Sequence, residues 1–327
     1  MIYLKKRNSY PLLSVDIDHF SDQPGTFCMS YGFDNSKLVK SIDTIGLINH
    51  PCIIKSKNQP IEVITGYRRI LALKELNVKE VFCFDLTDSG LTSYQILMFA
   101  LHDNLYTREL NTVEKSMVIR MLHELVKDSN LICEVCSLIK VNKKDYPVFL
   151  KINMLDDSIK QYISNDILNI KIIESLIRMD KEDILLISNL VNKLKLSYSY
   201  QLQFIDYTSD ISRIKKSPIS ILLNDENIQE VLRDEKKNIP QKAKEFMDYL
   251  RLMRNPNISR YKDIFEKKVK DLQLPENVRI QNPQFFESKG YRMEIDFNNG
   301  EELKKVLSEI TDEKYNLQNI KDPWVNE

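Results

Sequence analysis

Several residue types and sequence patterns that are common in proteins are scarce in this chain of 327 residues, and each scarcity excludes or disfavours certain classes of protein. Glycine occurs only 7 times and tryptophan once. Lysine plus arginine and aspartate plus glutamate number 47 each, so the formal net charge is zero, which disfavours a compact, strongly basic DNA-binding module. There is no long apolar run and no signal-peptide pattern, which predicts a cytoplasmic protein without a membrane span.

The cysteine content predicts a reduced protein rather than a disulfide framework. The chain has five cysteines, an odd number, and begins Met-Ile-Tyr-Leu-Lys-Lys-Arg. The one suggestive spacing, Cys133-x-x-Cys136, lies in an apolar helical stretch without a second Cys or His pair at zinc-site spacing. We therefore expect both cysteines to be buried structural residues.

The hydrophobic pattern predicts an α+β protein of three parts. Residues 1–127 show a small mixed α/β pattern, in which the first 30 or so residues are expected to be irregular because Pro11, Pro24 and Gly25 interrupt them. Residues 128–237 have a helical pattern nearly throughout. Residues 238–327 combine a charged helix, two strands that are typical of a β-hairpin, and a closing helix.

The most informative segment is a turn between a strand and a helix, Val63-Ile64-Thr65-Gly66-Tyr67-Arg68-Arg69. A glycine allows a tight turn and a close approach of the backbone to a ligand. The helix that follows adds free N–H groups and a positive dipole end, and an arginine fork matches phosphate oxygens. The turn is therefore expected to bind an anion, most naturally a nucleotide phosphate.

A second polar segment, Asp103-Asn104-Leu105 followed by Arg108, begins 34 residues beyond Arg69 (103 − 69). A carboxylate and a carboxamide at a helix end offer two oxygens that can bind a metal ion, and an arginine offers a guanidinium that can bind phosphate. Mg²⁺ nucleotides require this mixture of groups. The same residues also fit the solvated end of an ordinary helix, so the segment on its own does not identify a site.

In their order along the chain, these segments resemble the N-terminal domain of ParB-type partition proteins, which belong to the ParB/sulfiredoxin superfamily. In that family a glycine-led Arg-Arg box and a Glu-Asn-Leu-x-Arg box bind the triphosphate of CTP with Mg²⁺, and the segment after the first helix helps to hold the cytosine. The resemblance implies that CTP and Mg²⁺ are ligands here too. It assigns the metal and any catalytic step to Asp103 and Asn104, and it assigns nucleotide binding to Gly46, Asn49, Thr65, Gly66, Arg68, Arg69, Asn104 and Arg108.

The departures from the family pattern concern hydrolysis more than binding. Tyr67 stands where the family usually has a glutamate, and a phenol with a reference pKa near 10 is not an anionic metal ligand at neutral pH. Asp103 also replaces a glutamate and is one methylene shorter, and His50 replaces a common proline. Sulfiredoxin activity is not expected, since the position beside the arginine pair is a tyrosine and not a cysteine.

A DNA-reading helix-turn-helix follows the nucleotide domain in ParB-type proteins, and residues 131–155 occupy its place. Val141 stands at the turn position that is usually glycine, and Pro147 falls in or at the start of the second helix, so any such motif is degenerate. The candidate phosphate contacts are Lys143, Lys144 and Lys151. The C-terminal part resembles a module of a less-studied ParB-like group, and its hairpin and helix are a natural element for homodimerisation.

The leading hypothesis is a ParB-like protein that binds CTP and acts as a clamp or adaptor on DNA or a partner. CTP hydrolysis, if it occurs, is expected to be weak. A phosphotransferase or nuclease on the same fold is an alternative, with Asp103 or Glu109 as the base. A degenerate interaction module that binds no nucleotide is a second alternative.

Overall fold

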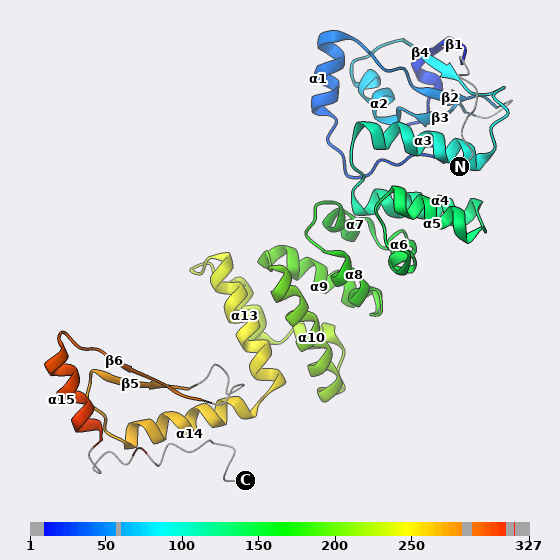
Figure 1. Ribbon diagram of the computed structural model, residues 1–327. Helices are drawn as coiled ribbons and strands as arrows, with labels where there is room; N and C mark the ends of the chain where they lie inside the picture. The colour runs from blue at the N-terminus through cyan, green and yellow to red at the C-terminus, as the bar shows by residue number, and fades with distance from the viewer. Residues whose placement is uncertain (1–9, 57–59, 283–289, 312–316, 318–327) are drawn as a thin grey trace. The chain divides into compact units, whose positions relative to one another are not determined.

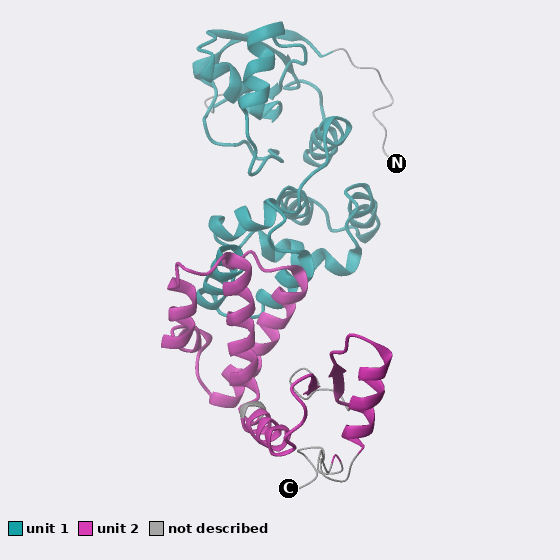
Figure 2. Ribbon diagram, turned by 90° about the vertical axis from the view of Figure 1, so that its left-hand side faces the viewer, with its two compact units in different colours: residues 1–193 teal, residues 194–327 magenta. Residues whose placement is uncertain are grey.

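The computed structural model describes residues 10–56, 60–282, 290–311 and 317. The chain divides into two compact units, residues 1–193 and 194–327 (Figure 2). The first unit holds a four-stranded sheet and a series of helices, and the second holds helices and a two-stranded sheet. The division into three parts at residues 127 and 237 stays a prediction.

The sheet of the first unit is mixed, in the order β1-β4-β2-β3 (Figure 1). Its antiparallel pairs are β1 with β4 and β2 with β3, and β2 runs parallel to β4. The strands are β1 (Leu12–Asp16), β2 (Cys52–Ile54), β3 (Glu62–Thr65) and β4 (Glu80–Asp85). The expectation that residues 1–30 are irregular is wrong for β1, because pairing with the distant β4 forms a strand despite the neighbouring Pro11.

Helices α1 (Ser36–Ile45) and α2 (Tyr67–Glu75) pack with these strands around one core. Ile70, Ala72 and Leu73 of α2 are buried there beside Ile53 and Val63 of the sheet. The core also includes part of the short 3-10 helix η1 (Ile17–His19). Because Arg68 and Arg69 precede the buried stripe of α2, the first turn of this helix lies at the edge of the core.

Two capping boxes begin the next helices. Thr92 and Gln95 cap α3 (Ser93–Thr107), and Asn111 and Glu114 cap α4 (Thr112–Leu125), as the sequence predicts for α4. Each box satisfies backbone N–H groups that have no partner within the helix. Helix α3 buries Leu97 and Leu101 completely and contacts β3, so its C-terminal end is held near the Gly66 turn.

The rest of the first unit is helical, as predicted. The turn after α5 places Lys140 in the left-handed region (φ 56°), while the neighbouring Val141 is buried. Pro147 lies in the first turn of α6, where proline is tolerated. The elements are α5 (Ser129–Leu138), η2 (Lys143–Asp145), α6 (Tyr146–Ile152), α7 (Asp157–Ser164), α8 (Ile170–Leu176) and α9 (Lys181–Leu194).

The second unit packs α10 (Tyr198–Lys215) against α13 (Ile239–Arg254), with Phe204 and Phe246 edge to face at a centroid separation of 5.1 Å. The predicted strands pair antiparallel as β5 (Val278–Gln281) and β6 (Arg292–Ile295), and the hairpin connection at 283–289 lies outside the described residues. The remaining helices are α11 (Ile219–Leu223), α12 (Glu226–Arg233), α14 (Asn257–Asp271) and α15 (Gly300–Ile310).

The two cysteines of the Cys133-x-x-Cys136 segment differ in burial. Cys136 is buried, whereas Cys133 is partly exposed, so the prediction of two buried cysteines is wrong for Cys133. The helical pattern around 131–139 buries one side of α5 only, and Cys133 lies off that side.

Among the described residues, none of the helices combines the length and the hydrophobicity that a membrane span requires.

Candidate nucleotide-binding site

The Gly66 turn has the conformation that the sequence predicts for an anion-binding turn. Gly66 is the N-cap of α2 and has φ 91° and ψ 16°, a left-handed conformation. A Cβ atom at this position would come within 3.0 Å of the Cα and Cβ of Pro51. The residue before it, Thr65, is buried at the end of β3. Only a glycine fits here without displacing the chain that leads into β2.

Arg69 joins three segments that are far apart in the sequence. Its Nη1 donates hydrogen bonds to the carbonyl oxygens of Asn49 at 2.8 Å and of His50 at 3.2 Å. Its Nη2 forms an ion pair with Asp103 Oδ2 at 3.3 Å. The structure thus brings the Gly66 turn together with the segment after α1 and with the Asp103 segment of α3.

Arg68 lies on the other side of the same helical turn and contacts residues 33–35. Its guanidinium stacks over the ring of Phe33, 4.7 Å from the centroid, and its Nη2 donates to Asp34 O at 2.9 Å. Partial burial lowers the pKa of Arg68, and the nearby positive charge of Arg108 lowers it further. The guanidinium still stays protonated, so Arg68 contributes a permanent positive charge at this turn, whereas the charge of Arg108 is paired with Glu114.

Arg108 is held by a buried carboxylate. Its Nη1 forms an ion pair with Glu114 Oε2 at 2.5 Å, and Glu114 is only 3% exposed. Its Nη2 donates to Met29 O at 2.6 Å and to Asn104 Oδ1 at 3.2 Å. Two residues separate Arg108 from Leu105, one more than in the family's Glu-Asn-Leu-x-Arg box. Both terminal nitrogens of Arg108 are therefore engaged by the protein itself.

Tyr67 does not take the place of the missing acid. Its hydroxyl donates to Asp22 O at 2.7 Å, and its ring meets Phe33 edge to face. Burial raises the pKa of Tyr67 above its ordinary value, and the neighbouring Cys28 and Asp22 raise it further. The phenol is neutral at physiological pH, so it cannot serve as an anionic metal ligand.

Asp103 is the carboxylate that fits a metal-bound nucleotide at this site. Its side chain is 41% exposed, so one carboxylate edge faces solvent beside Arg69. The Asn104 amide is more constrained, because its Nδ2 donates to Ala100 O at 2.8 Å and its Oδ1 accepts from Arg108. The described residues contain no group of three His, Cys, Asp or Glu side chains able to hold a metal ion. Mg²⁺ commonly binds through one or two protein oxygens plus phosphate and water, which is the donor set available here.

The other predicted site residues lie around this centre or away from it. Gly46 ends α1 with φ 78°, and the exposed Asn49 contributes its backbone to Arg69. Glu109, the alternative base, is 90% exposed and pairs with Lys140 at 3.0 Å, which lowers its pKa below the ordinary value. Lys143 and Lys144 are exposed in η2 before α6, and Lys151 is exposed near the end of α6.

Glu114 and residues 29–31 also belong to this region, although the sequence did not predict it. Besides Arg108, Glu114 accepts hydrogen bonds from the backbone N–H groups of Tyr31 at 3.1 Å and Asn111 at 3.0 Å. The Asn111 side chain in turn donates to Tyr31 O at 3.1 Å. The Asn-x-x-Glu capping box was the available signal, but a capping box alone predicts a helix start and not a buried ion pair.

Comparison with known proteins gives one curated relative, and no protein-family model matches the chain. The relative is the probable chromosome-partitioning protein ParB of Campylobacter jejuni, which is 25% identical over 174 residues. The match covers 52% of this chain and 59% of that protein, so the chain spans about three-fifths of the length of this relative.

Solved ParB structures were also found, with low overall similarity. One is C-terminally truncated ParB of Caulobacter crescentus in complex with CTP-gamma-S, which is 15% identical, with a TM-score of 0.26, and covers 55% of this chain and 98% of that one. Another is the same truncated protein in complex with the centromeric parS site, which is 15% identical, with a TM-score of 0.34, and covers 58% of this chain and 96% of that one. A Pnob8-like ParB-N domain is 13% identical, with a TM-score of 0.34, and covers 73% of this chain and 98% of that one. Over these 174 residues the sequence of the chain is similar to that of a ParB chromosome-partitioning protein.

Proposed function

We propose that this ParB-like protein binds a cytidine triphosphate with Mg²⁺ at the Gly66 turn and acts as a nucleotide-dependent clamp or adaptor on DNA in partition or a related process. The observation that carries the proposal is the position of Arg69. This one guanidinium contacts the backbone at Asn49 and His50 and the carboxylate of Asp103. A ligand at this point would meet a helix N-terminus, an arginine pair and a carboxylate together.

Each part of the nucleotide has a group of matching chemistry in the site. Arg68, Arg69 and the N–H groups at the start of α2 would bind phosphate oxygens, and the backbone of Gly46–Asn49 would lie near the base. Asp103 would provide a carboxylate oxygen to Mg²⁺, with Asn104 beside it. When bound, the metal would neutralise phosphate charge. Both terminal nitrogens of Arg108 and of Arg69 already donate within the protein, so these two arginines would contact phosphate through their remaining N–H groups. The charge of Arg108 is in addition paired with Glu114.

The site favours nucleotide retention over efficient hydrolysis. A general base must reach the water that attacks the γ-phosphate. Tyr67 is hydrogen-bonded to Asp22 and neutral, and the carboxylate of Asp103 is paired with Arg69. We therefore propose slow hydrolysis or none. Product formation from labelled CTP that is abolished by Asp103→Ala would instead support the phosphotransferase or nuclease alternative.

Replacing Arg69 with alanine is expected to abolish nucleotide binding. The change removes a guanidinium that binds phosphate, and it breaks the contacts that hold the backbone of Asn49 and His50 and the carboxylate of Asp103 in place. Isothermal titration of CTP, ATP, GTP and UTP into the full chain with Mg²⁺ measures this directly. We expect heat with CTP above the other nucleotides, and a loss of about 3 kcal/mol or more in binding free energy for Arg69→Ala, as charged hydrogen bonds in a binding site commonly contribute.

The matched control is Arg178→Ala, since Arg178 is an exposed arginine just beyond the end of α8 whose one ion pair among the described residues is with Glu174. This variant should bind CTP like the unmodified chain. No heat with any nucleotide would contradict the proposal and favour the nucleotide-free interaction module. That alternative has one observation in its favour, because Arg69 and Arg108 already pair with Asp103 and Glu114. It also predicts no thermal stabilisation, whereas a ligand at 100 times its Kd adds about 2.7 kcal/mol.

The proposed DNA contact is at the start of α6. Lys143 and Lys144 are exposed there, and within the described residues neither side chain forms an ion pair. Pro147 lies in the first turn of α6 and leaves the rest of that helix regular. The net charge of zero limits long-range attraction to DNA, so any contact must be local.

The double change Lys143→Ala, Lys144→Ala is expected to weaken DNA binding equally on all sequences and to reduce the salt dependence. Each lost phosphate contact lowers the slope of log K against log salt by about 0.9. Electrophoretic mobility shifts across a salt series on random and partition-site duplexes measure this slope. Lys171→Ala, an exposed lysine on α8, is the control. An unchanged slope in the double variant would place DNA binding elsewhere or exclude it.

A further inference from the structure

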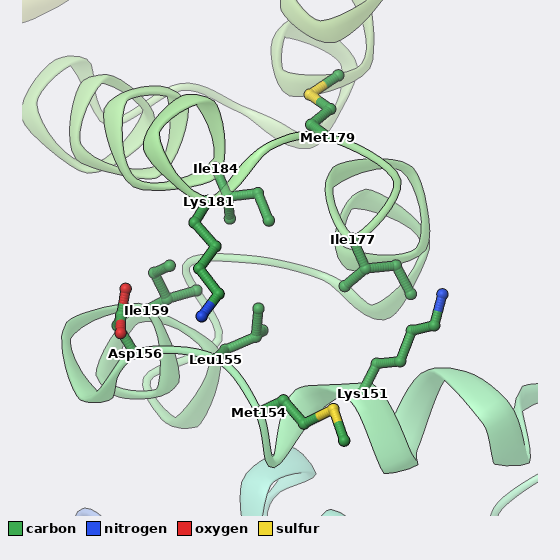
Figure 3. Close-up of a pocket in the computed structure, with 9 residues that line it drawn as sticks. All are labelled: Lys151, Met154, Leu155, Asp156, Ile159, Ile177, Met179, Lys181 and Ile184. Atoms are coloured by element: carbon green, nitrogen blue, oxygen red, sulfur yellow. The ribbon is translucent and has the colours of Figure 1, made fainter.

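An open, mainly apolar groove lies among α6, α7, α8 and α9, away from the residues assigned to the nucleotide (Figure 3). Its volume is about 210 Å³. For comparison, an apolar cavity of about 150 Å³ accommodates a benzene ring. The groove is therefore large enough for an aromatic or a large aliphatic side chain. Its lining residues are Lys151, Met154, Leu155, Asp156, Ile159, Ile177, Met179, Lys181 and Ile184.

The apolar side chains of the groove do not all serve the core. Ile159 and Ile184 are buried at its base, but Leu155, Ile177 and Met179 are only partly buried, and Met154 is 81% exposed. Exposed methionines beside an apolar groove adapt to different partner side chains, since the thioether chain is unbranched and polarizable. A groove lined by apolar side chains with a few charged groups at its edges is a common form of site for an apolar anchor of a ligand or peptide.

Two lysines give the groove a charge. Lys151 comes from α6 and Lys181 from the start of α9, and Figure 3 shows them on opposite sides of the groove, with the Lys181 nitrogen beside Leu155 and the Lys151 nitrogen beyond Ile177. In the described part of the chain, neither lysine forms an ion pair, whereas the nearby Lys160 pairs with Asp157 and Arg178 with Glu174. Asp156 is the single carboxylate among the lining residues that the structure describes, so the lining carries a net positive charge.

We propose that this groove binds an acidic amphipathic peptide segment of a partner protein. A large apolar side chain of the segment would enter between Met154, Leu155 and Ile177. Carboxylates on either side of it would pair with Lys151 and Lys181. The arrangement fits the helix-in-groove mode of peptide recognition, in which apolar anchors give affinity and flanking charges give orientation.

The apolar lining favours a peptide over DNA as the occupant. Charged phosphates are not stabilised by methionine and isoleucine side chains, and positioning contacts to DNA come from polar and basic groups. Lys151, which the sequence analysis assigned to DNA, is placed by the structure on this groove together with Lys181. The two exposed lysines of η2 are better candidates for DNA than Lys151.

The test uses the full chain and a fluorescein-labelled designed helical peptide with leucine and tryptophan on one face and glutamates beside them. Fluorescence anisotropy should show binding of this peptide with a Kd on the order of 100 μM or lower. A matched peptide with lysines in place of the glutamates should bind at least about tenfold more weakly, because it places like charges against Lys151 and Lys181.

The double change Lys151→Glu, Lys181→Glu should reverse the preference between the two peptides. Met154→Asn, which removes the apolar side chain without adding a charge, should weaken both, and since Met154 is mostly exposed this variant should fold normally. The control Lys171→Glu, at an exposed lysine of α8 that does not line the groove, should bind the acidic peptide like the unmodified chain. Equal binding of the two peptides, or no effect of the Lys151 and Lys181 changes, would overturn the proposal. A loss of DNA binding in the Lys151/Lys181 variant without loss of peptide binding would also overturn it.

Discussion

Replacing Glu114 with alanine is expected to lower the free energy of unfolding of the first unit by about 3 kcal/mol, the lower end of the range for breaking a buried ion pair. The carboxylate is 3% exposed and accepts three hydrogen bonds, from Arg108 and from the backbone of Tyr31 and Asn111. Its removal leaves the Arg108 charge without its partner and two N–H donors without theirs. Because 22% of the Arg108 side-chain surface is exposed to solvent, water compensates part of the lost interaction.

Urea denaturation followed by circular dichroism measures this effect. A loss of about 3 kcal/mol lowers the midpoint by roughly 1 M or more at typical slopes. The control is Glu109→Ala, a carboxylate five residues away (114 − 109) that forms an ion pair with Lys140 on the surface. That variant should leave the midpoint unchanged, because exposed ion pairs contribute little. Equal midpoints for Glu114→Ala and Glu109→Ala would show that the buried pair does not stabilise the unit.

Replacing Gly66 with alanine should cost about 3 kcal/mol of stability and also eliminate nucleotide binding. A left-handed conformation costs a non-glycine residue about 1–2 kcal/mol. The remainder comes from the added Cβ, which would lie within 3.0 Å of Pro51 and 3.3 Å of the Arg69 guanidinium carbon. The backbone must therefore shift at the point where Arg69 meets Asn49, and the geometry of the proposed phosphate site is lost with it.

Gly90→Ala is the matched control for this prediction. Gly90 also has a positive φ, of 67°, but a Cβ there would meet no atom within 4 Å. It should cost about 1 kcal/mol, the conformational part alone, and should leave CTP binding intact. Thermal unfolding and CTP titration of both variants separate the two contributions. Equal destabilisation of the two variants would show that contact with Pro51 is unimportant.

The elements that depend on neighbouring residues were predictable from the sequence. The glycine-led turn before α2, the capping box of α4 and the strands β5 and β6 all occur close to where the sequence predicts them. Their signals are local, because a cap or a turn is determined by residues within a few positions of each other. The strand β1 was missed because its formation depends on pairing with β4, nearly 70 residues later (80 − 12 = 68), and no local pattern contains that information.

The composition and order of the candidate site were determined by the sequence, whereas its charge pairing was decided only by the tertiary structure. The sequence supplies Gly66, Arg68, Arg69 and Asp103 in the ParB-like order, and the helix caps fix where each helix begins. The structure pairs Arg69 with Asp103, ties Arg108 to Glu114 and Met29, and turns Tyr67 toward Asp22. These contacts join residues up to 79 positions apart, and they form only when packing of the sheet and helices brings the segments together. The scarcity of glycine left Gly66 as a clear signal in the sequence, but which charges surround it depends on the fold.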